Sequence, residues 1–327
     1  MRRLNLILAG LVVALGTATA EAMTYNLTLC GASPGGLWSL LGAGVDAAMK
    51  AAYPGSTITY QTSGGGFANV GLLENNTCDL AIIHDAELIV AKNGGAPFKA
   101  PITSLGTIAV LYDWAPMHFI VTKAFAEKHG VQSLADIAKK KLPIRIMLNR
   151  RGNVASQVGQ TALEAAGASL EDIEAWGGQV IFAASREQGD LIKNRRADAI
   201  FNSLFVGHRS IRQVAEAVEM TLLPLSDDVV KKVADSWKIA PYTIKGGSYA
   251  WQPADTGTVT LSAQLVASNS LDSAVAYDVA KALVEHVDKV QAVHKAMKPL
   301  STKLLASGLA VPYHAGAAKY YKEAGLQ

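Results

Sequence analysis

The chain has 327 residues, with 30 Lys and Arg against 27 Asp and Glu and a formal net charge of +3. So small a positive excess argues against a nucleic-acid-binding protein, which needs a clustered basic face. Two cysteines are too few for a metal cluster, and we expect neither a metal nor a cofactor.

Residues 1–22 are typical of a secretory signal peptide. Met1-Arg2-Arg3 precedes an apolar segment from Leu4 to Ala18, and small residues predict cleavage near Ala20 or Ala22. No later stretch is apolar over the roughly 20 residues that a membrane span needs. We therefore expect an exported, periplasmic and soluble chain.

The first part of the remaining chain alternates strands with helices. A short strand from Tyr25 to Leu29 leads into the glycine-rich stretch Cys30–Gly44, and a second, Thr57–Gln61, leads into Ser63-Gly64-Gly65-Gly66. A third, Asp79–Ile83, delivers His84 and Asp85 to its carboxyl end. This alternation predicts an α/β fold with mainly parallel sheets, helices on both faces, and ligands at the carboxyl ends of the strands.

The middle of the chain predicts a second unit of the same design. Runs at 103–111 and 117–122 predict two strands, and the Pro-containing segment 112–116 between them predicts the exit from the first lobe. A strand at 144–148, a polar turn at 149–153 and a helix from Val154 to Gly167 follow. The stretch 78–82 is echoed by 197–201.

About 300 residues exceed one core and favour two lobes. The run 258–267 predicts a strand that returns the chain to the first lobe. We therefore expect residues 23–116 and 258–327 to form lobe I, residues 117–257 to form lobe II, and two crossing strands to form a hinge.

Export permits a disulfide between Cys30 and Cys78, but strand geometry argues against it. Cys30 ends its strand and Cys78 precedes a strand, so in parallel neighbours the two thiols would lie at opposite ends of the sheet. We expect two free, buried thiols.

Several motifs together resemble one family. Cys30–Gly44, Tyr60–Asn69, Asp79–Asp85, Tyr249 and the tail Tyr313–Gly325 are similar to the TAXI family, the solute-binding proteins of tripartite ATP-independent periplasmic (TRAP) transporters. The resemblance implies a type II-like two-lobe periplasmic-binding-protein fold, a small organic anion in the cleft between lobes, and delivery to a TRAP permease. Members favour glutamate-like amino acids, dicarboxylates or oxo acids. The chain departs from the family at His84 and at the turn Arg150-Arg151-Gly152-Asn153.

A serine hydrolase is the alternative that the string Gly31-Ala32-Ser33-Pro34-Gly35 suggests. A nucleophile elbow needs the backbone N–H of the residue after the serine, and Pro34 has none. We therefore expect no enzyme, and no catalytic residue.

The predicted ligand-binding residues cluster at the carboxyl ends of the strands. Arg150 is the expected counter-charge for a carboxylate, with a solvated surface arginine as the alternative. Trp38 is equally well explained as a core residue, and Asp85 as half of a hydrogen bond between lobes. The full predicted set is Ser33, Gly36, Leu37, Trp38, Ser63, Gly64, Gly65, Asn69, His84, Asp85, Arg150, Asn153, Val154, Asn202, Ser203 and Tyr249.

The sequence thus predicts a monomeric solute-binding protein that closes on a small anion by hinge bending. Two alternatives share the fold: a binding protein of an ABC-type transporter, and a surface protein that senses a ligand and signals.

Overall fold

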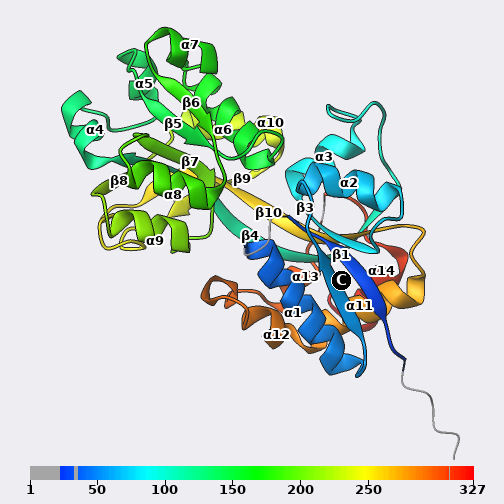
Figure 1. The fold of residues 1–327 in the computed structure, drawn as a ribbon. Coiled ribbons are helices and arrows are strands. Elements are labelled where there is room, and N and C mark those ends of the chain that lie inside the picture. Colours follow the sequence, from blue (N-terminus) through cyan, green and yellow to red (C-terminus); the bar gives the residue numbers. More distant parts are fainter. Residues whose placement is uncertain (1–22, 33–35, 309) are drawn as a thin grey trace, which may run out of the picture.

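The computed structural model describes residues 23–32, 36–308 and 310–327. The predicted signal peptide and Ser33 lie outside the described residues. Figure 1 shows two lobes joined by long strands. Within the described ranges, every helix is too short or too polar to cross a membrane.

Ten strands form one array in the order β2-β1-β3-β10-β4-β7-β5-β6, with β9 beside β10 and β8 beside β4. Their bounds are β1 Asn26–Cys30, β2 Thr57–Gln61, β3 Leu80–His84, β4 Leu105–Thr122, β5 Arg145–Leu148, β6 Gln179–Phe182, β7 Ala199–Ser203, β8 Met220–Leu223, β9 Ala240–Ile244 and β10 Thr256–Ser268.

Helices cover both faces of each half of the array. The first lobe carries α1 Leu37–Ala52, α2 Gly66–Glu74, α3 Asp85–Lys92, α11 Ser273–Glu285, α12 Val287–Gln291, the 3-10 helix η1 Lys295–Met297, α13 Thr302–Leu305 and α14 Ala315–Glu323. The second lobe carries α4 Lys123–His129, α5 Ala135–Lys139, α6 Val154–Ala165, α7 Leu170–Ala175, α8 Ser185–Lys193, α9 Arg209–Ala215 and α10 Asp227–Trp237.

The prediction of two strands around 112–116 was wrong, because β4 runs unbroken through both lobes. Its first part pairs with β10 and its last part pairs with β7 and β8. Pro116 lies where the partners change, and although it lacks an N–H its carbonyl accepts from Leu204 N–H (3.2 Å). A proline is tolerated in a strand where its missing donor is not needed.

Strand directions make the carboxyl ends of the two parallel groups point toward each other. β10 runs antiparallel to both β3 and β4, so β3 and its parallel neighbours β1 and β2 end in the direction in which β4 leaves the first lobe. β7 runs antiparallel to β4, so β7 and its parallel neighbours β5 and β6 end in the direction of the first lobe. The loops that follow these six strands therefore lie on the facing sides of the two lobes.

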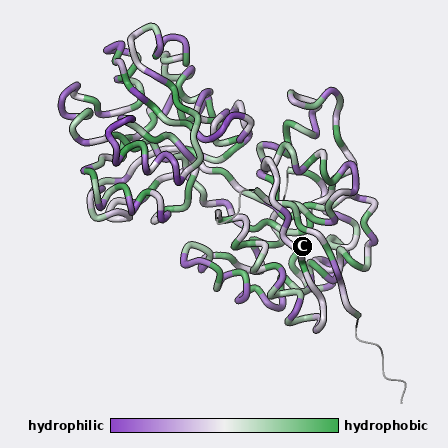
Figure 2. Tube along the Cα trace, viewed as in Figure 1, coloured by the Kyte–Doolittle hydropathy of each residue, from purple (hydrophilic) through white to green (hydrophobic). Residues whose placement is uncertain are grey.

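Apolar side chains fill separate cores on either side of each sheet. In the first lobe, Leu29 and Leu41 belong to the core beneath α1 and α11, whereas Val70 and Ile83 belong to the core beneath α2 and α3. The second lobe is built in the same way, with a large core that includes Phe201 and a smaller one beneath α8 and α9. Figure 2 shows the corresponding apolar strands inside more polar helices.

The two cysteines form a disulfide, so the prediction of free thiols was wrong. The Cα atoms of Cys30 and Cys78 lie 5.9 Å apart, and both residues are buried. The prediction assumed that β1 and β3 lie level, but the first residue of β3, Leu80, pairs with Leu29 and Ala81 pairs with Cys30. The start of β3 therefore lies beside the end of β1, and Cys78 comes close to Cys30.

The echoed stretches 78–82 and 197–201 make the same contacts in the two lobes. Asp79 Oδ2 accepts from Thr28 N–H (2.7 Å) while Asp79 N–H donates to the Thr28 carbonyl (3.1 Å). Asp198 Oδ2 accepts from Arg145 N–H (2.9 Å) while Asp198 N–H donates to the Arg145 carbonyl (2.8 Å). Each aspartate thus fixes the first strand of its lobe beside the third.

Candidate ligand-binding site

The region between the facing carboxyl ends contains the predicted site residues that the structure describes, apart from Tyr249, which follows β9. In the first lobe they follow β1, β2 and β3, and in the second lobe they lie at the ends of β5 and β7. Each must be judged by whether its polar atoms are already occupied within the protein, because a satisfied buried group has little left to offer a ligand.

His84 belongs to a hydrogen-bonded chain of four buried side chains. Trp38 Nε1–H donates to Tyr112 Oη (3.0 Å), Tyr112 Oη lies 3.3 Å from His84 Nε2, and His84 Nδ1 lies 3.0 Å from Glu87 Oε2. Glu87 Oε2 accepts from Nδ1–H, and in a neutral imidazole with its proton on Nδ1, Nε2 accepts from Tyr112. Both ring nitrogens of His84 therefore have partners within the protein.

Burial shapes the chemistry of this chain. Glu87 is 1% exposed and His84 is 9% exposed. Burial raises the pKa of the Tyr112 hydroxyl, so Tyr112 stays protonated and remains a donor. The chain holds Trp38 and His84 ring against ring, with centroids 4.8 Å apart.

An aromatic cluster extends this chain to the second lobe. Phe205, two residues after β7, packs edge to face on Tyr112 with centroids 4.9 Å apart and lies 6.3 Å from the ring of Trp114. Trp114 Nε1 is buried and has no hydrogen-bond partner among the described residues. Phe205 thus gives the second lobe an aromatic contact with the middle of β4.

Sequence reasoning missed Glu87, Tyr112, Trp114 and Phe205. The aromatic pair on either side of Asp113 was a signal, since it lay in the segment expected to link the lobes. Phe205 and Glu87 carried no signal of their own, because both depend on which strands are neighbours.

Asn69 and Ser63 brace the first lobe. Asn69 is fully buried, and its Nδ2 donates to the carbonyls of Gly31 (2.8 Å) and Ile82 (2.8 Å), which ties β1 to β3. Ser63 Oγ donates to the Gly31 carbonyl or to Asn69 Oδ1, each 2.5 Å away, and accepts from Gly65 N–H (3.0 Å). These two side chains are therefore engaged within the protein.

The three consecutive glycines beside them have partly structural causes. Gly65 has φ +104°, which disfavours any side chain. A Cβ at Gly66 would lie 1.6 Å from Glu87 Oε2, so a glycine there allows the buried carboxylate to approach the start of α2. Only Gly64 is exposed.

Among the described residues, no side chain caps the start of α1. Gly36 is its N-cap and has no side chain to accept from the first N–H groups of the helix, which begins at Leu37. Upstream, Tyr60 Oη accepts from Ala32 N–H (2.7 Å), which fixes Ala32 beside β2. Such a helix start favours a negatively charged group.

Asp85 is half-buried at the start of α3. Its Oδ1 accepts from Gln264 Nε2–H (2.7 Å), a contact with β10. Burial raises the pKa of this carboxyl group above its ordinary value. Gln264 pairs with β3 in the sheet of the first lobe, so this hydrogen bond lies within one lobe and is not the expected alternative of a hydrogen bond between lobes.

Most of the predicted site residues of the second lobe are buried or hydrogen-bonded to other protein groups. Asn153 caps α6 by accepting from Ala155 N–H (2.9 Å), and Val154 is fully buried. Asn202 is fully buried and donates to Ser185 and Gln188, while Ser203 Oγ–H donates to the Ala115 carbonyl (2.6 Å).

Tyr249 is likewise engaged. Its Oη lies 2.9 Å from His118 Nε2 and accepts from Gly207 N–H (3.1 Å). His118 Nδ1 lies 2.9 Å from the Pro116 carbonyl and must carry its proton, so Nε2 accepts from Tyr249. The pair fixes the loop after β7 to β4.

Arg150 differs from these residues because it is exposed. None of the ion pairs among the described residues includes it. Its neighbour Arg151 lies over the ring of Phe182, with Cζ 3.8 Å from the centroid. Arg150 is thus the predicted side chain whose charge is free to meet an anion.

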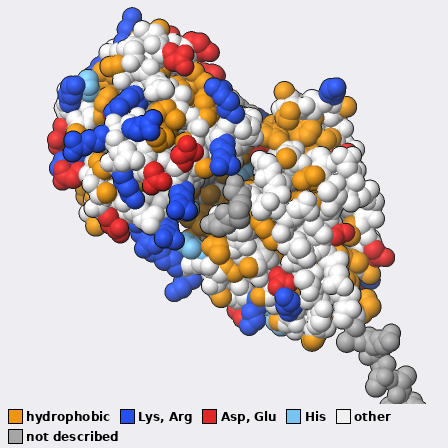
Figure 3. All heavy atoms as spheres, in the orientation of Figure 1, with side chains coloured by type: hydrophobic (Ala, Val, Ile, Leu, Met, Phe, Trp, Pro, Cys, Tyr) orange, Lys and Arg blue, Asp and Glu red, His pale blue; other side chains and the backbone are white. Residues whose placement is uncertain are grey.

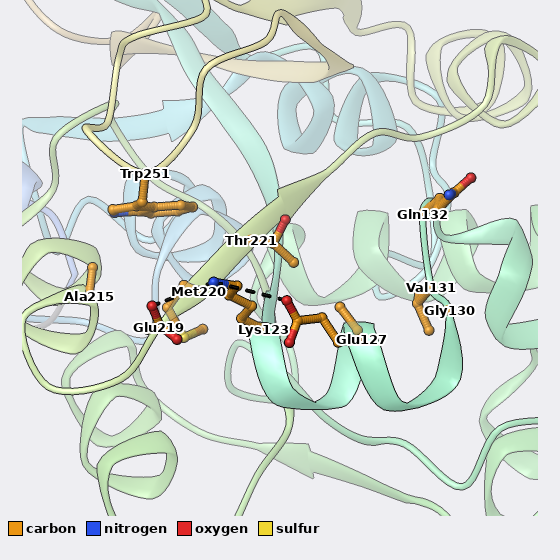
Figure 4. A pocket seen from close by; sticks show the side chains of 11 residues that line it. Lys123, Glu127, Gly130, Val131, Gln132, Ala215, Glu219, Met220, Thr221 and Trp251 are labelled. Atoms are coloured by element: carbon orange, nitrogen blue, oxygen red, sulfur yellow. Dashed lines mark ion pairs between the residues drawn. The ribbon is translucent and has the colours of Figure 1, made fainter.

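A surface pocket of about 740 Å³ lies elsewhere, between α4, β8 and Trp251 (Figure 4). Lys123 in its wall is already paired with Glu219 (3.5 Å) and Glu127 (3.9 Å). Lys123 directly follows the end of β4, so this pocket lies at the end of the second lobe that is remote from the first. No group of three potential metal ligands is found among the described residues.

Comparisons with known proteins agree with this architecture. A model of the NMT1-like family matches residues 29–325. Similar solved structures include a TctC solute-binding protein from Polaromonas, at 11% identity and a TM-score of 0.52. The match covers 85% of this chain and 90% of that chain.

Two further structures were solved with ligands. MatC from Rhodopseudomonas palustris with bound malate is 13% identical with TM-score 0.54, and covers 84% of this chain and 88% of that chain. PhnD1 from Prochlorococcus marinus in complex with methylphosphonate is 10% identical with TM-score 0.55, and covers 92% of this chain and 99% of that chain. The chain has the two-lobe mixed α/β fold of periplasmic binding proteins.

Proposed function

Because the chain belongs to the NMT1-like family and has the fold of periplasmic binding proteins, we propose that it captures a small organic anion between its lobes and delivers it to a membrane transporter. The observation that carries the proposal is the strand topology, which points the carboxyl ends of both parallel groups at each other. In open α/β sheets this edge is where ligands bind.

The finer assignment rests on the motifs that resemble the TAXI family. We propose a TRAP permease as the transporter partner, export through the segment 1–22, and a periplasmic location. The lobes would extend over 23–116 with 258–327, and over 117–257.

The ligand contacts proposed here are fewer than the predicted set. The N–H groups at the start of α1, from Gly36 onward, would meet one acidic group, and Arg150 would meet another from the opposite lobe. Asn69, His84, Asn202 and Tyr249 would hold these groups in place, since their polar atoms contact other protein groups. A glutamate-like amino acid, a dicarboxylate or an oxo acid has the required chemistry.

A thermal-shift panel tests the proposal. The purified chain is heated with glutamate, glutamine, 2-oxoglutarate, malate and methylphosphonate in turn, at constant ionic strength. A ligand at about 100 times its Kd stabilises the folded state by about 2.7 kcal/mol, which raises the melting temperature by several degrees. A melting temperature that no carboxylate or amino acid raises would contradict a solute-binding role.

A further inference from the structure

Two short segments from different lobes meet beside the aromatic cluster. One is the loop Phe205–His208 after β7, and the other is the pair His294-Lys295 at the start of η1, which follows α12 on the first lobe. The rings of Phe205 and His294 lie with centroids 6.3 Å apart. Lys295 Nζ lies 3.6 Å from the position that a Cβ on Gly207 would occupy.

The two histidines present hydrogen-bond donors. His208 Nδ1 accepts from Ser210 N–H (3.2 Å), and His294 Nδ1 accepts from Ala296 N–H (3.1 Å). A neutral imidazole whose Nδ1 accepts carries its proton on Nε2. Both Nε2–H groups are therefore donors. The acceptor nitrogen of each ring, Nδ1, is already used by a backbone N–H group.

Two permanent cations complete a basic cluster. Arg212 lies one turn into α9 from His208, and Arg212 and Lys295 are both exposed. None of the ion pairs among the described residues includes either of them. On the face drawn in Figure 3, Lys and Arg side chains gather with a histidine near the junction of the lobes.

The charged groups that shift the pKa values of the two histidines are basic. Burial first, and then His294 and Arg212, lower the pKa of His208 to about 4. Burial first, and then Lys295 and Arg212, lower the pKa of His294. Arg212 and Lys295 therefore supply the positive charge of the cluster, the neutral histidines supply N–H donors, and an oxyanion can interact favourably with both.

We propose that His208, Arg212, His294 and Lys295 form an oxyanion site between the lobes, which takes a carboxylate, phosphonate or sulfonate group. The role of this site rests on the proposed function. An acidic group bound there contacts both lobes and so stabilises their closed arrangement. Two residues come from each lobe, so neither lobe alone supplies the full set of donors. The oxyanion is either part of the captured solute or a free inorganic ion.

Histidine NMR of the purified chain tests this site with inorganic sulfate, at ionic strength kept constant with sodium chloride. Sulfate is expected to shift the Nε2 resonances of His208 and His294 with a saturable profile. The double variant Arg212→Ala/Lys295→Ala should weaken the apparent affinity for sulfate at least tenfold. The control Lys193→Ala/Lys322→Ala removes one exposed lysine from each lobe, neither of which forms an ion pair among the described residues, and should change the affinity less than twofold.

Resonances that do not respond to sulfate, or an equal loss of affinity in both double variants, would overturn the site. A second arm titrates glutarate alone and then with sulfate: competition identifies the solute's acid group as the occupant, and independent binding identifies a free anion. A chain that binds a panel acid but whose His208 and His294 resonances do not respond to sulfate refutes this site alone. A chain whose histidines respond to sulfate but that binds no solute refutes the proposed function alone.

Discussion

At the scale of single residues, the buried carboxylate of Glu87 organises the end of β3. It accepts from the backbone N–H of His84 (3.1 Å) and from His84 Nδ1, which in turn orients Nε2 toward Tyr112 and, through it, Trp38. Glu87 is 1% exposed, so no water can take its place as the acceptor for the two N–H groups of His84. The position of Trp38 at the start of α1 thus depends on a residue that no ligand needs to touch.

Replacing Glu87 with Leu should therefore lower the free energy of unfolding by about 2–4 kcal/mol, because two buried N–H groups lose their acceptor. Urea denaturation measures the change. The control Glu164→Leu alters an exposed residue of α6 and should change stability by less than about 0.5 kcal/mol. Equal stability of the two variants would show that the Glu87 contacts contribute little.

His118 makes stability depend on pH. It is fully buried, and burial lowers its pKa to about 4 from the ordinary 6.5. The unfolded chain therefore binds a proton at a pH where the folded chain does not. This contribution to stability is complete above pH 6.5 and falls by up to about 1.4 kcal/mol per pH unit between pH 6.5 and 4.

Urea denaturation from pH 7 to 4.5 should show this loss, and His118→Gln should have a shallower dependence on pH. The wild-type protein and the variant are compared by slope, since removing the Tyr249 contact also lowers stability at every pH. Parallel curves for the two proteins would mean that His118 does not titrate as its burial predicts.

Arg150 is expected to act on binding and not on stability. It is exposed and outside the ion pairs of the described chain, so Arg150→Ala should leave the melting temperature of the unliganded chain within about a degree. If its guanidinium meets an acid group in the closed form, affinity should fall at least tenfold, or about 1.4 kcal/mol. Isothermal titration calorimetry, with the panel acid that binds most tightly, measures this loss of affinity.

Arg196→Ala is the matched control, because Arg196 is exposed and precedes β7 at the amino end of the sheet. Affinity that Arg150→Ala leaves unchanged would remove Arg150 from the site.

At the scale of elements, the disulfide joins the end of β1 to the turn before β3. It closes a loop across 48 positions that includes α1, β2 and α2. Constraining an unfolded loop of that length stabilises the fold by about 4 kcal/mol in the chain-entropy model. The bond thus supports the first-lobe edge where α1 and α2 begin.

The double variant Cys30→Ala/Cys78→Ala should lose up to about 4 kcal/mol of the free energy of unfolding. Dithiothreitol should destabilise the wild-type protein by a similar amount and leave the double variant unchanged. A wild-type protein that is insensitive to the reductant in urea would contradict a stabilising disulfide.

Local sequence patterns predicted which strands and turns exist, but not how the strands pair and which residues contact each other. The carboxyl ends at Cys30, Gln61 and His84 followed from strand runs that end in glycine or polar residues. The continuity of β4 did not, because pairing with β7, β8 and β10 overrides the local effect of Pro116. The register that brings Cys78 to Cys30 likewise depends on contacts with another strand, among them the hydrogen bond from Thr28 N–H to Asp79.

For the candidate site too, the sequence predicted where polar residues lie but not which protein groups they contact. Asn69 and Asn202 lie where predicted, yet both are fully buried and hydrogen-bonded to protein groups. Sequence places a polar residue at the end of a strand but does not reveal whether a neighbouring strand already uses it. Arg150 is the opposite case, since its exposure leaves its charge available.

At the scale of the whole molecule, β4 and β10 both run through the junction of the lobes (Figure 1). Most hydrogen bonds of these strands lie within one lobe or the other, and the register of β4 with β10 shifts between Leu261 and Gln264. An irregular pair of strands can bend there without breaking either core, which is the property that a hinge needs. The lobe boundaries at 116/117 and 257/258 stay a prediction.

Closure should follow from ligand binding if the solute contacts both lobes. A ligand shifts the open–closed equilibrium only by its difference in affinity for the two forms, and a change from 1:99 to 99:1 needs about 5.5 kcal/mol. X-ray scattering of the chain, with and without the panel acid that raises the melting temperature most, should show a smaller radius of gyration at saturation. Arg150→Ala, saturated with the same acid, should close less completely, because the second lobe then loses its charged contact. An unchanged radius for the saturated wild-type protein would mean that the acid binds one lobe alone and that β4 and β10 do not act as a hinge.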